Sequence, residues 1–156
     1  MVSLGGTTGV YARSYPALDR AVEVGFASGH VISVSFPETV PEDAAQDHEL
    51  LDRVDAYLAG EEESFTDVEL GLTLPTDRRE VLEATRNLPY GESASLSRLT
   101  RLAGRDDNDS EDLEFVREAL SENPTPLLIP DHRVEGGPYA TPGTVRGTFR
   151  EIEELR

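Results

Sequence analysis

Apolar and polar residues alternate with a period of two in the first part of the chain, on both sides of Ser28-Gly29. The alternating apolar residues are Val22, Val24 and Phe26 before this pair and Ile32, Val34 and Phe36 after it. Such alternation across two turn-forming residues predicts a β-hairpin. Residues Gly9–Tyr15 are expected to form a further strand.

A spacing typical of a helix follows the hairpin. The apolar residues at this spacing are Leu50, Leu51, Val54 and Leu58. They predict a helix that begins near Asp43 and ends before Gly60. The first half of the chain is therefore expected to form a small α/β lobe.

Three further helices are predicted in the second half. The first begins at a cap on Thr76 or Asp77, the second near Ser93 and the third at a cap on Ser110. Their expected buried residues are Val81, Leu82 and Leu88, then Leu96, Leu99 and Leu102, then Leu113, Val116 and Leu120. The last two helices flank a short polar turn, which can form a helix-turn-helix but is more often found between two helices that only pack together. The apolar run Leu127–Ile129 then predicts a short strand.

The chain is strongly acidic. It carries 31 acidic and 14 basic residues, a net charge of −17, and every basic residue is arginine. The acids are spread along the sequence, so the pattern indicates a salt-adapted protein of a haloarchaeal-type cytosol rather than an acidic tail or a nucleic-acid mimic. In such salt the Debye length falls to about 3 Å, so the negative charge does not exclude DNA binding.

The absence of cysteine excludes disulfides, thiolate metal sites and a thiol nucleophile. His30 and His48 lie far apart in the sequence, and we expect neither a metal nor a cofactor. There is no apolar run near the roughly 18 residues of a membrane span, and the N-terminal MVSLGGTTGVYAR lacks the features of a signal peptide. We therefore expect a cytoplasmic protein without membrane contact.

Residues 123–134, NPTPLLIPDHRV, resemble the signature of the O6-alkylguanine-DNA alkyltransferase family, in which a PCHRV motif carries the methyl-accepting cysteine. Asp131 stands at the position of that cysteine. Residues 89–92, PYGE, resemble a second family motif. The resemblance implies an α/β N-terminal lobe (1–75) and a mainly helical DNA-binding and active-site lobe with a helix-turn-helix (76–156).

The resemblance also implies roles for individual residues. His132 corresponds to the histidine that activates the cysteine, and Glu153 to the glutamate that orients this histidine. Asn123 is expected to bond around the active-site turn, and the residues expected to form the lesion pocket are Pro130, Val134 and Tyr139. Without the resemblance, Glu153 would be interpreted as a solvated side chain and Asn123 as a helix C-cap.

Two differences from the family concern DNA. The family flips the target base out of the stack, and the resemblance places Ser95, Leu96, Glu114 and Arg117 at the DNA. Leu96 replaces the tyrosine that pushes the neighbouring phosphate, and Glu114 replaces the arginine finger, for which Arg117 could substitute one turn further on. Several arginines of this lobe are expected to form either a phosphate-binding stripe or counter-charges in an acidic surface; they are Arg98, Arg101, Arg105 and Arg117.

Two hypotheses of function follow. In the first, a monomer binds double-stranded DNA at O6-alkylguanine, transfers no methyl group, and marks the lesion for an excision-repair protein. Attack by Asp131 would form a hydrolysable ester, but oxygen is a poorer nucleophile than sulfur, so we expect no enzyme activity. In the second, the chain has lost DNA binding and serves as a protein-interaction or regulatory scaffold.

Overall fold

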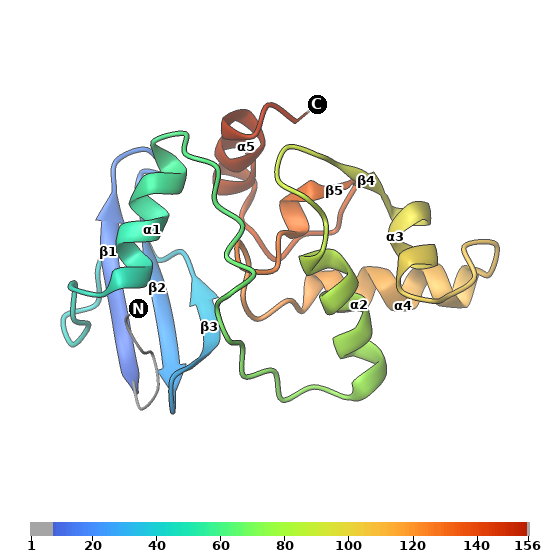
Figure 1. Cartoon of the computed structure of the whole chain (residues 1–156), viewed down its shortest axis with the longest axis horizontal. Helices are drawn as coiled ribbons and strands as arrows, with labels where there is room; N and C mark the ends of the chain where they lie inside the picture. Colours follow the sequence, from blue (N-terminus) through green and yellow to red (C-terminus); the bar gives the residue numbers. More distant parts are fainter. Residues whose placement is uncertain (1–7, 156) are drawn as a thin grey trace.

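The computed structural model describes residues 8–155 and contains a small sheet at one end and helices at the other (Figure 1). The expectation that there is no signal peptide rests partly on residues 1–7, which lie outside the described range. Within residues 8–155, no helix is long and apolar enough to cross a membrane. The expected fold class, an α/β lobe followed by a mainly helical lobe, is confirmed.

The sheet contains the three predicted strands in antiparallel order. They are β1 (Gly9–Tyr15), β2 (Arg20–Ala27) and β3 (His30–Ser35). Ser28 and Gly29 have φ angles of 49° and 82°, as both central residues of a type I′ hairpin require. The hairpin prediction is therefore confirmed.

One apolar residue of the hairpin lies on the opposite face from the one predicted. The pairing of β2 with β3 shifts between Gly25 and Phe26, so that Phe26 pairs with Val31 and Gly25 with Ser33. This bulge places Val31 in the core and leaves Ile32 43% exposed, because one extra residue reverses the alternation of side chains.

The first helix, α1 (Glu49–Leu58), begins several residues later than the expected start near Asp43. The preceding segment is extended instead. The backbone of Ala45 accepts a hydrogen bond from Ala12 and donates one to Val10, which covers the edge of β1. His48 then caps the helix by accepting a hydrogen bond from the backbone N–H of Leu50. Pairing with a strand edge has overridden the local helical pattern.

The C-terminal region consists of four helices and a minimal two-stranded parallel sheet. The helices are α2 (Thr76–Arg86), α3 (Leu96–Leu102), α4 (Ser110–Ser121) and α5 (Gly143–Ile152); the strands are β4 (Ala94–Ser95) and β5 (Val134–Glu135). Three predicted helix starts differ from the structure. The caps of α2 and α4 are Pro75 and Asp109, rather than Thr76 or Asp77 and Ser110. Helix α3 begins at Leu96, after its cap Ser95, rather than near Ser93.

Two predictions of apolar structure in this region were wrong. Leu102, expected to be buried, is the last residue of α3 and is 52% exposed. Leu127–Ile129 does not form a strand but part of a tight turn, in which the Ile129 N–H bonds to the Thr125 carbonyl. The turn sends Leu127 and Leu128 into the core beneath the sheet.

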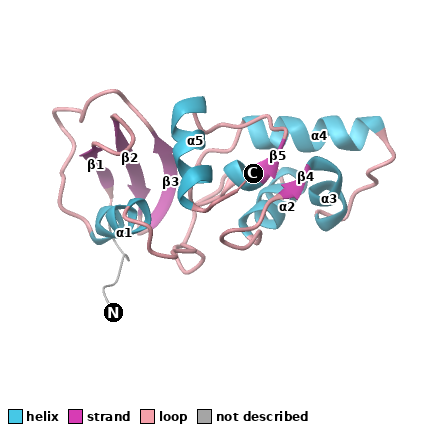
Figure 2. Cartoon of the chain, turned by 90° about the horizontal axis from the view of Figure 1, so that it is seen from above, coloured by secondary structure: helices cyan, strands magenta, loops and turns pink. Residues whose placement is uncertain are grey.

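The core beneath the sheet draws on both ends of the chain. Alongside residues of the sheet and α1 it contains Val145 and Phe149 of α5, together with Leu127 and Leu128. A second core is formed among the helices around Leu99, Val116 and Leu120. Helix α5 therefore lies between the sheet and helices α2, α3 and α4 (Figure 2). The boundary between residues 75 and 76 stays a prediction.

Candidate functional site

The PDHRV residues form a buried turn after α4. Asp131–Arg133 make one 3-10 turn, η1, and Pro130 and Val134 on either side of it are also buried. Asn123, just after α4, holds this turn: its amide donates to the Ile129 carbonyl (2.9 Å), and its oxygen accepts from the Thr125 N–H (3.0 Å). The geometry expected for Asn123, bonding around the turn, is present.

The Asp131 carboxylate has no solvent exposure and accepts four hydrogen bonds. Oδ1 accepts from the Thr141 hydroxyl at 2.6 Å. Oδ2 accepts from the Asn123 amide (3.2 Å) and from the backbone N–H groups of Ala140 (2.9 Å) and Thr141 (3.3 Å). Both oxygens are thus engaged in holding the 140–141 segment onto η1.

Burial raises the pKa of Asp131, while its hydrogen bonds, chiefly that from Thr141, act in the opposite direction. Hydrogen bonds to a carboxylate favour its charged form, and removal from water disfavours it. With its lone pairs directed at four donors, the group would have to break these bonds before attacking an alkyl carbon.

His132 and Glu153, far apart in the sequence, are in contact. Nε2 of His132 lies 2.6 Å from Oε2 of Glu153, and both side chains have no exposure. The Tyr57 hydroxyl in α1 donates to the same oxygen at 2.5 Å. Burial, followed by the charge of Glu153, raises the pKa of Tyr57, so this hydroxyl remains a donor. The interpretation of Glu153 as a solvated glutamate is excluded.

Two further segments bond to Glu153. Arg133 donates to it through Nε (2.7 Å) and through a terminal nitrogen (3.2 Å), and the Gly91 N–H donates at 3.1 Å. Burial acts to raise the pKa of Glu153, but the bonds from His132 and Arg133 outweigh it and lower this pKa to about 2. Glu153 is therefore an anion that neutralises Arg133 inside the protein.

Burial also lowers the pKa of His132, although Glu153 opposes that shift. The imidazole is therefore neutral near pH 7. With its Nε2–H directed at Glu153, Nδ1 is left as an acceptor, and it is buried without a partner among residues 8–155. A neutral imidazole held by a carboxylate can take up a proton, but the sequence offers no thiol to supply one. No group of three metal-ligating side chains occurs in the described part of the chain.

The residues expected at the DNA lie on α3 and α4. Ser95 caps α3 by accepting from the backbone N–H of Arg98, and Leu96 is partly buried at the first position of that helix. Glu114 and Arg117 are exposed on α4 and form an ion pair with each other at 3.5 Å. Their DNA contacts stay a prediction.

Most arginines around these helices are paired with acids. Arg101 bonds to Asp107 (2.5 Å) and Arg105 to Asp112 (3.0 Å), and Arg117 has its partner in Glu114. Arg98 has no side-chain partner in the described range. The interpretation of these residues as counter-charges in an acidic surface is favoured for the three paired arginines.

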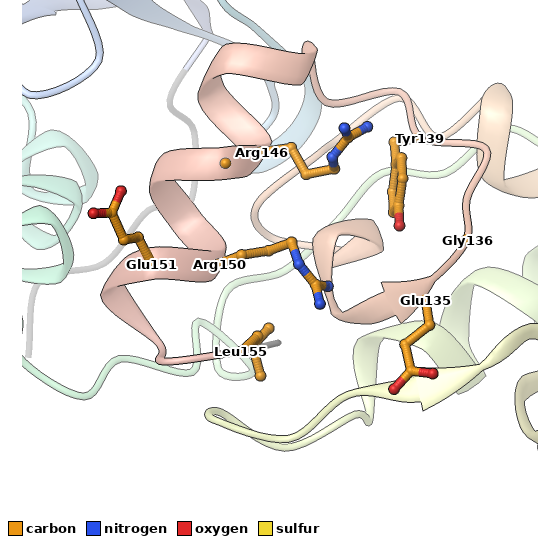
Figure 3. A pocket seen from close by; sticks show the side chains of 8 residues that line it. Glu135, Gly136, Tyr139, Arg146, Arg150, Glu151 and Leu155 are labelled. Carbon is orange, nitrogen blue, oxygen red and sulfur yellow. The ribbon is translucent and has the colours of Figure 1, made fainter.

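Tyr139 precedes the two residues whose N–H groups reach Asp131. Its ring lies under the guanidinium of Arg146 on α5, with 4.2 Å between the ring centre and Cζ (Figure 3). A side chain at Gly137 would meet this ring at 2.7 Å, so the ring position requires glycine there. The assignment of Pro130, Val134 and Tyr139 to a lesion pocket stays a prediction.

The sequence did not point to five partners of the site: Tyr57, Gly91, Arg133, Ala140 and Thr141. Arg133 and Gly91 belong to the quoted motifs and carried that much signal. Thr141 follows Tyr139 closely but nothing in its surroundings indicates a buried hydroxyl. Tyr57 lies in the other half of the chain, where no motif was found.

Solved structures with the same fold define its class. Mycobacterium tuberculosis OGT in complex with DNA aligns with a TM-score of 0.70 at 23% identity, over 93% of this chain and 90% of that one. The O6-methylguanine methyltransferase of the same organism gives 0.69 at 24% identity, over 94% and 92%. O6-methylguanine-DNA methyltransferase from the archaeon Pyrococcus kodakaraensis gives 0.68 at 16% identity, over 94% and 100%. The fold is that of the alkyltransferases.

The sequence itself gives the family. Residues 77–154 match the family described as 6-O-methylguanine DNA methyltransferase, DNA binding domain. The chain therefore belongs to the 6-O-methylguanine DNA methyltransferase family, and the resemblance seen in its motifs is confirmed. No match was found among curated protein sequences.

Proposed function

We propose that this protein binds double-stranded DNA through its C-terminal lobe and recognises guanine alkylated at O6 without accepting the alkyl group. The observation that carries the proposal is the state of Asp131. A carboxylate with four hydrogen bonds stands where the family has its nucleophile, in a chain without cysteine that keeps the family's fold.

The carboxylate position sets the expected mode of recognition. A flipped guanine placed against Asp131 would offer its amino group as a donor, whereas its acceptor edge would be repelled. The N–H groups of Ala140 and Thr141 already donate to Asp131, so the amino group of the base must compete with them for the carboxylate. We therefore expect weak binding with a modest preference for the lesion, by a monomer whose further partner is an excision-repair protein.

A titration of duplex DNA with and without one O6-methylguanine tests the proposal. The affinity for each duplex is measured by gel shift in multimolar KCl, and the methyl group of the O6-methylguanine carries the label. We expect a shift of both duplexes, tighter for the lesion, with no label on the protein and no restored guanine. Label on the protein, or release of methanol, would overturn the absence of transfer, and equal affinity for both duplexes would overturn lesion recognition.

A scaffold without DNA binding is the second candidate. It is favoured by the ion pairs that occupy Arg101, Arg105 and Arg117, because an arginine paired within its own lobe must lose that partner to contact a phosphate. If neither duplex shifts while the circular dichroism spectrum is that of folded protein, the scaffold function takes precedence.

A further inference from the structure

An open hollow of about 590 Å³ lies between α5 and the segment that follows β5 (Figure 3). Its lining consists of Glu135, Gly136, Tyr139, Arg146, Gly147, Arg150, Glu151 and Leu155. We name it the α5 hollow. It lies outside the hydrogen-bond network of Asp131, and Tyr139 is the one lining residue that also belongs to the predicted lesion pocket.

The charges that face into the α5 hollow are positive. Figure 3 shows Arg146 directed at Tyr139, whereas the Glu151 carboxylate points away on the other side of α5. Glu135 points away from both arginines, and its carboxylate accepts a hydrogen bond from Ser93 at 2.9 Å. Because the whole chain has a net charge of −17, the attraction of this site for an anion is confined to its immediate surroundings.

Unlike Arg101, Arg105 and Arg117, Arg146 lacks an acidic partner. No carboxylate pairs with it within residues 8–155; its contact is the Tyr139 ring at 4.2 Å. A guanidinium stacked on an aromatic ring keeps its N–H edge available for a phosphate oxygen, and the ring restricts its motion before binding. Arg146 can thus bind an anion without breaking an ion pair.

The hollow adjoins the surface expected to meet DNA. Strand β5 pairs in parallel with β4, so that Glu135 lies beside Ser95, the cap of α3. On the α5 side, a side chain added at Gly147 would meet nothing within 4 Å. The helix surface beside Arg146 is therefore open to a DNA strand.

From this geometry we infer that the α5 hollow binds a backbone phosphate of the DNA, held by Arg146 on its Tyr139 platform. The inference rests on the proposed DNA binding and adds to it an anchor outside the two helices α3 and α4. Arg150 links this anchor to the buried turn, because its guanidinium donates to the His132 carbonyl at 2.7 Å. The phosphate held there would therefore belong to the strand segment next to the site.

The test compares Arg146→Gln with the parent by fluorescence anisotropy on duplex DNA, with and without O6-methylguanine. Arg20→Gln is the matched control: it removes the same charge from β2, outside the region that matches the family. All measurements use KCl concentrations at which the circular dichroism spectra coincide. We expect Arg146→Gln to weaken binding of both duplexes roughly tenfold, and to make the slope of log K against log[KCl] shallower by about 0.9. Arg20→Gln should leave both quantities unchanged.

Two variants of the platform separate a direct phosphate contact from a loss of folding. Tyr139→Phe keeps the ring and should keep the parent's affinity, whereas Tyr139→Leu should approach Arg146→Gln. If the parent binds DNA and Arg146→Gln binds it equally well with an unchanged salt slope, the inference is wrong and the proposed function stands. If the parent binds neither duplex, both are wrong.

Discussion

The hydroxyl of Thr141 donates to Oδ1 of Asp131 across 2.6 Å, and neither residue is accessible to solvent beyond 2%. This bond joins the segment after Tyr139 to Asp131, which the motif resemblance assigns to the position of the family's nucleophile. The carboxylate accepts from buried donors there, and it thereby stabilises the loop that borders the site.

Replacing Asp131 separates this structural role from the charge. In Asp131→Asn the amide oxygen can accept from Asn123 and the two backbone N–H groups, while the amide nitrogen donates to the Thr141 hydroxyl oxygen. We expect a free energy of unfolding within about 1 kcal/mol of the parent at pH 7, but a loss of about 3 kcal/mol or more in Asp131→Ala, which removes the acceptor of four hydrogen bonds and leaves the buried hydroxyl and N–H of Thr141 without a partner. Urea unfolding measures both, and equal losses would contradict the explanation.

The stability of the parent and that of Asp131→Asn should depend differently on pH. Because burial raises the pKa of Asp131 above 3.8, the folded state holds this proton more strongly than the unfolded state. The parent is therefore favoured at low pH and loses that advantage as the pH rises from 3.8 through the folded-state pKa. Relative to the parent, Asp131→Asn should gain stability over this range. An unfolding free-energy difference that does not change with pH would contradict the raised pKa.

The stability that Glu153 contributes should depend on pH in the opposite direction. Its pKa is lowered from 4.5 to about 2, so its contribution is complete above pH 4.5 and is lost as the pH falls toward 2. We expect Glu153→Gln to cost about 3 to 5 kcal/mol at pH 7, because Arg133 stays buried without its anion. This difference from the parent should shrink between pH 4.5 and 2. Glu151→Gln, on the exposed side of α5, is the control and should show no such loss.

The sequence predicted more of the site than of its surroundings. The contact between His132 and Glu153 and the bonds of Asn123 around the turn were expected from the resemblance to the alkyltransferase family, and the structure contains both. Tyr57 was not expected, since a side chain contributed by the other half of the chain depends on how α1 packs against α5. No local pattern carries that information.

The errors in the fold have a similar cause. The helix expected from Asp43 begins at Glu49 because Ala45 bonds to the edge of β1, and Ile32 is exposed because a bulge shifts the register of β3. Leu127 lies in a turn because Asn123 bonds across it to Ile129. In each case a tertiary contact outweighs the periodicity of a short segment.

Restoring the nucleophile tests whether the site can still hold a lesion. Asp131→Cys supplies a thiol beside the His132–Glu153 pair. We expect the labelled methyl group of O6-methylguanine DNA to be transferred to the protein, with at most one label per chain. Ser121→Cys, at the exposed end of α4, controls for nonspecific reaction and should remain unlabelled. The parent has no thiol, so the background is zero. A folded, DNA-binding Asp131→Cys that takes no label would argue against lesion recognition.

The acidic helix α4 can be tested by reversing one charge. Glu114→Arg removes a repulsion and releases Arg117 from its ion pair, so DNA binding should tighten by about 1 kcal/mol at constant salt. The double change with Leu96→Tyr should gain more. Glu42→Arg makes the same charge change in the segment between β3 and α1 and should gain less. If all three variants bind alike, the gain reflects net charge alone, and α4 does not face DNA.

Glu153 accepts hydrogen bonds from Tyr57 in α1, Gly91 after α2, and His132 and Arg133 in η1. Detaching the sheet and α1 would leave a buried carboxylate short of one donor, and detaching α5 would leave Arg133 without its counter-ion. Neither end of the molecule can open by itself at low cost. Amide hydrogens in β2 and in α4 should therefore exchange with solvent through one shared global opening, so that the two cores behave as a single cooperative unit.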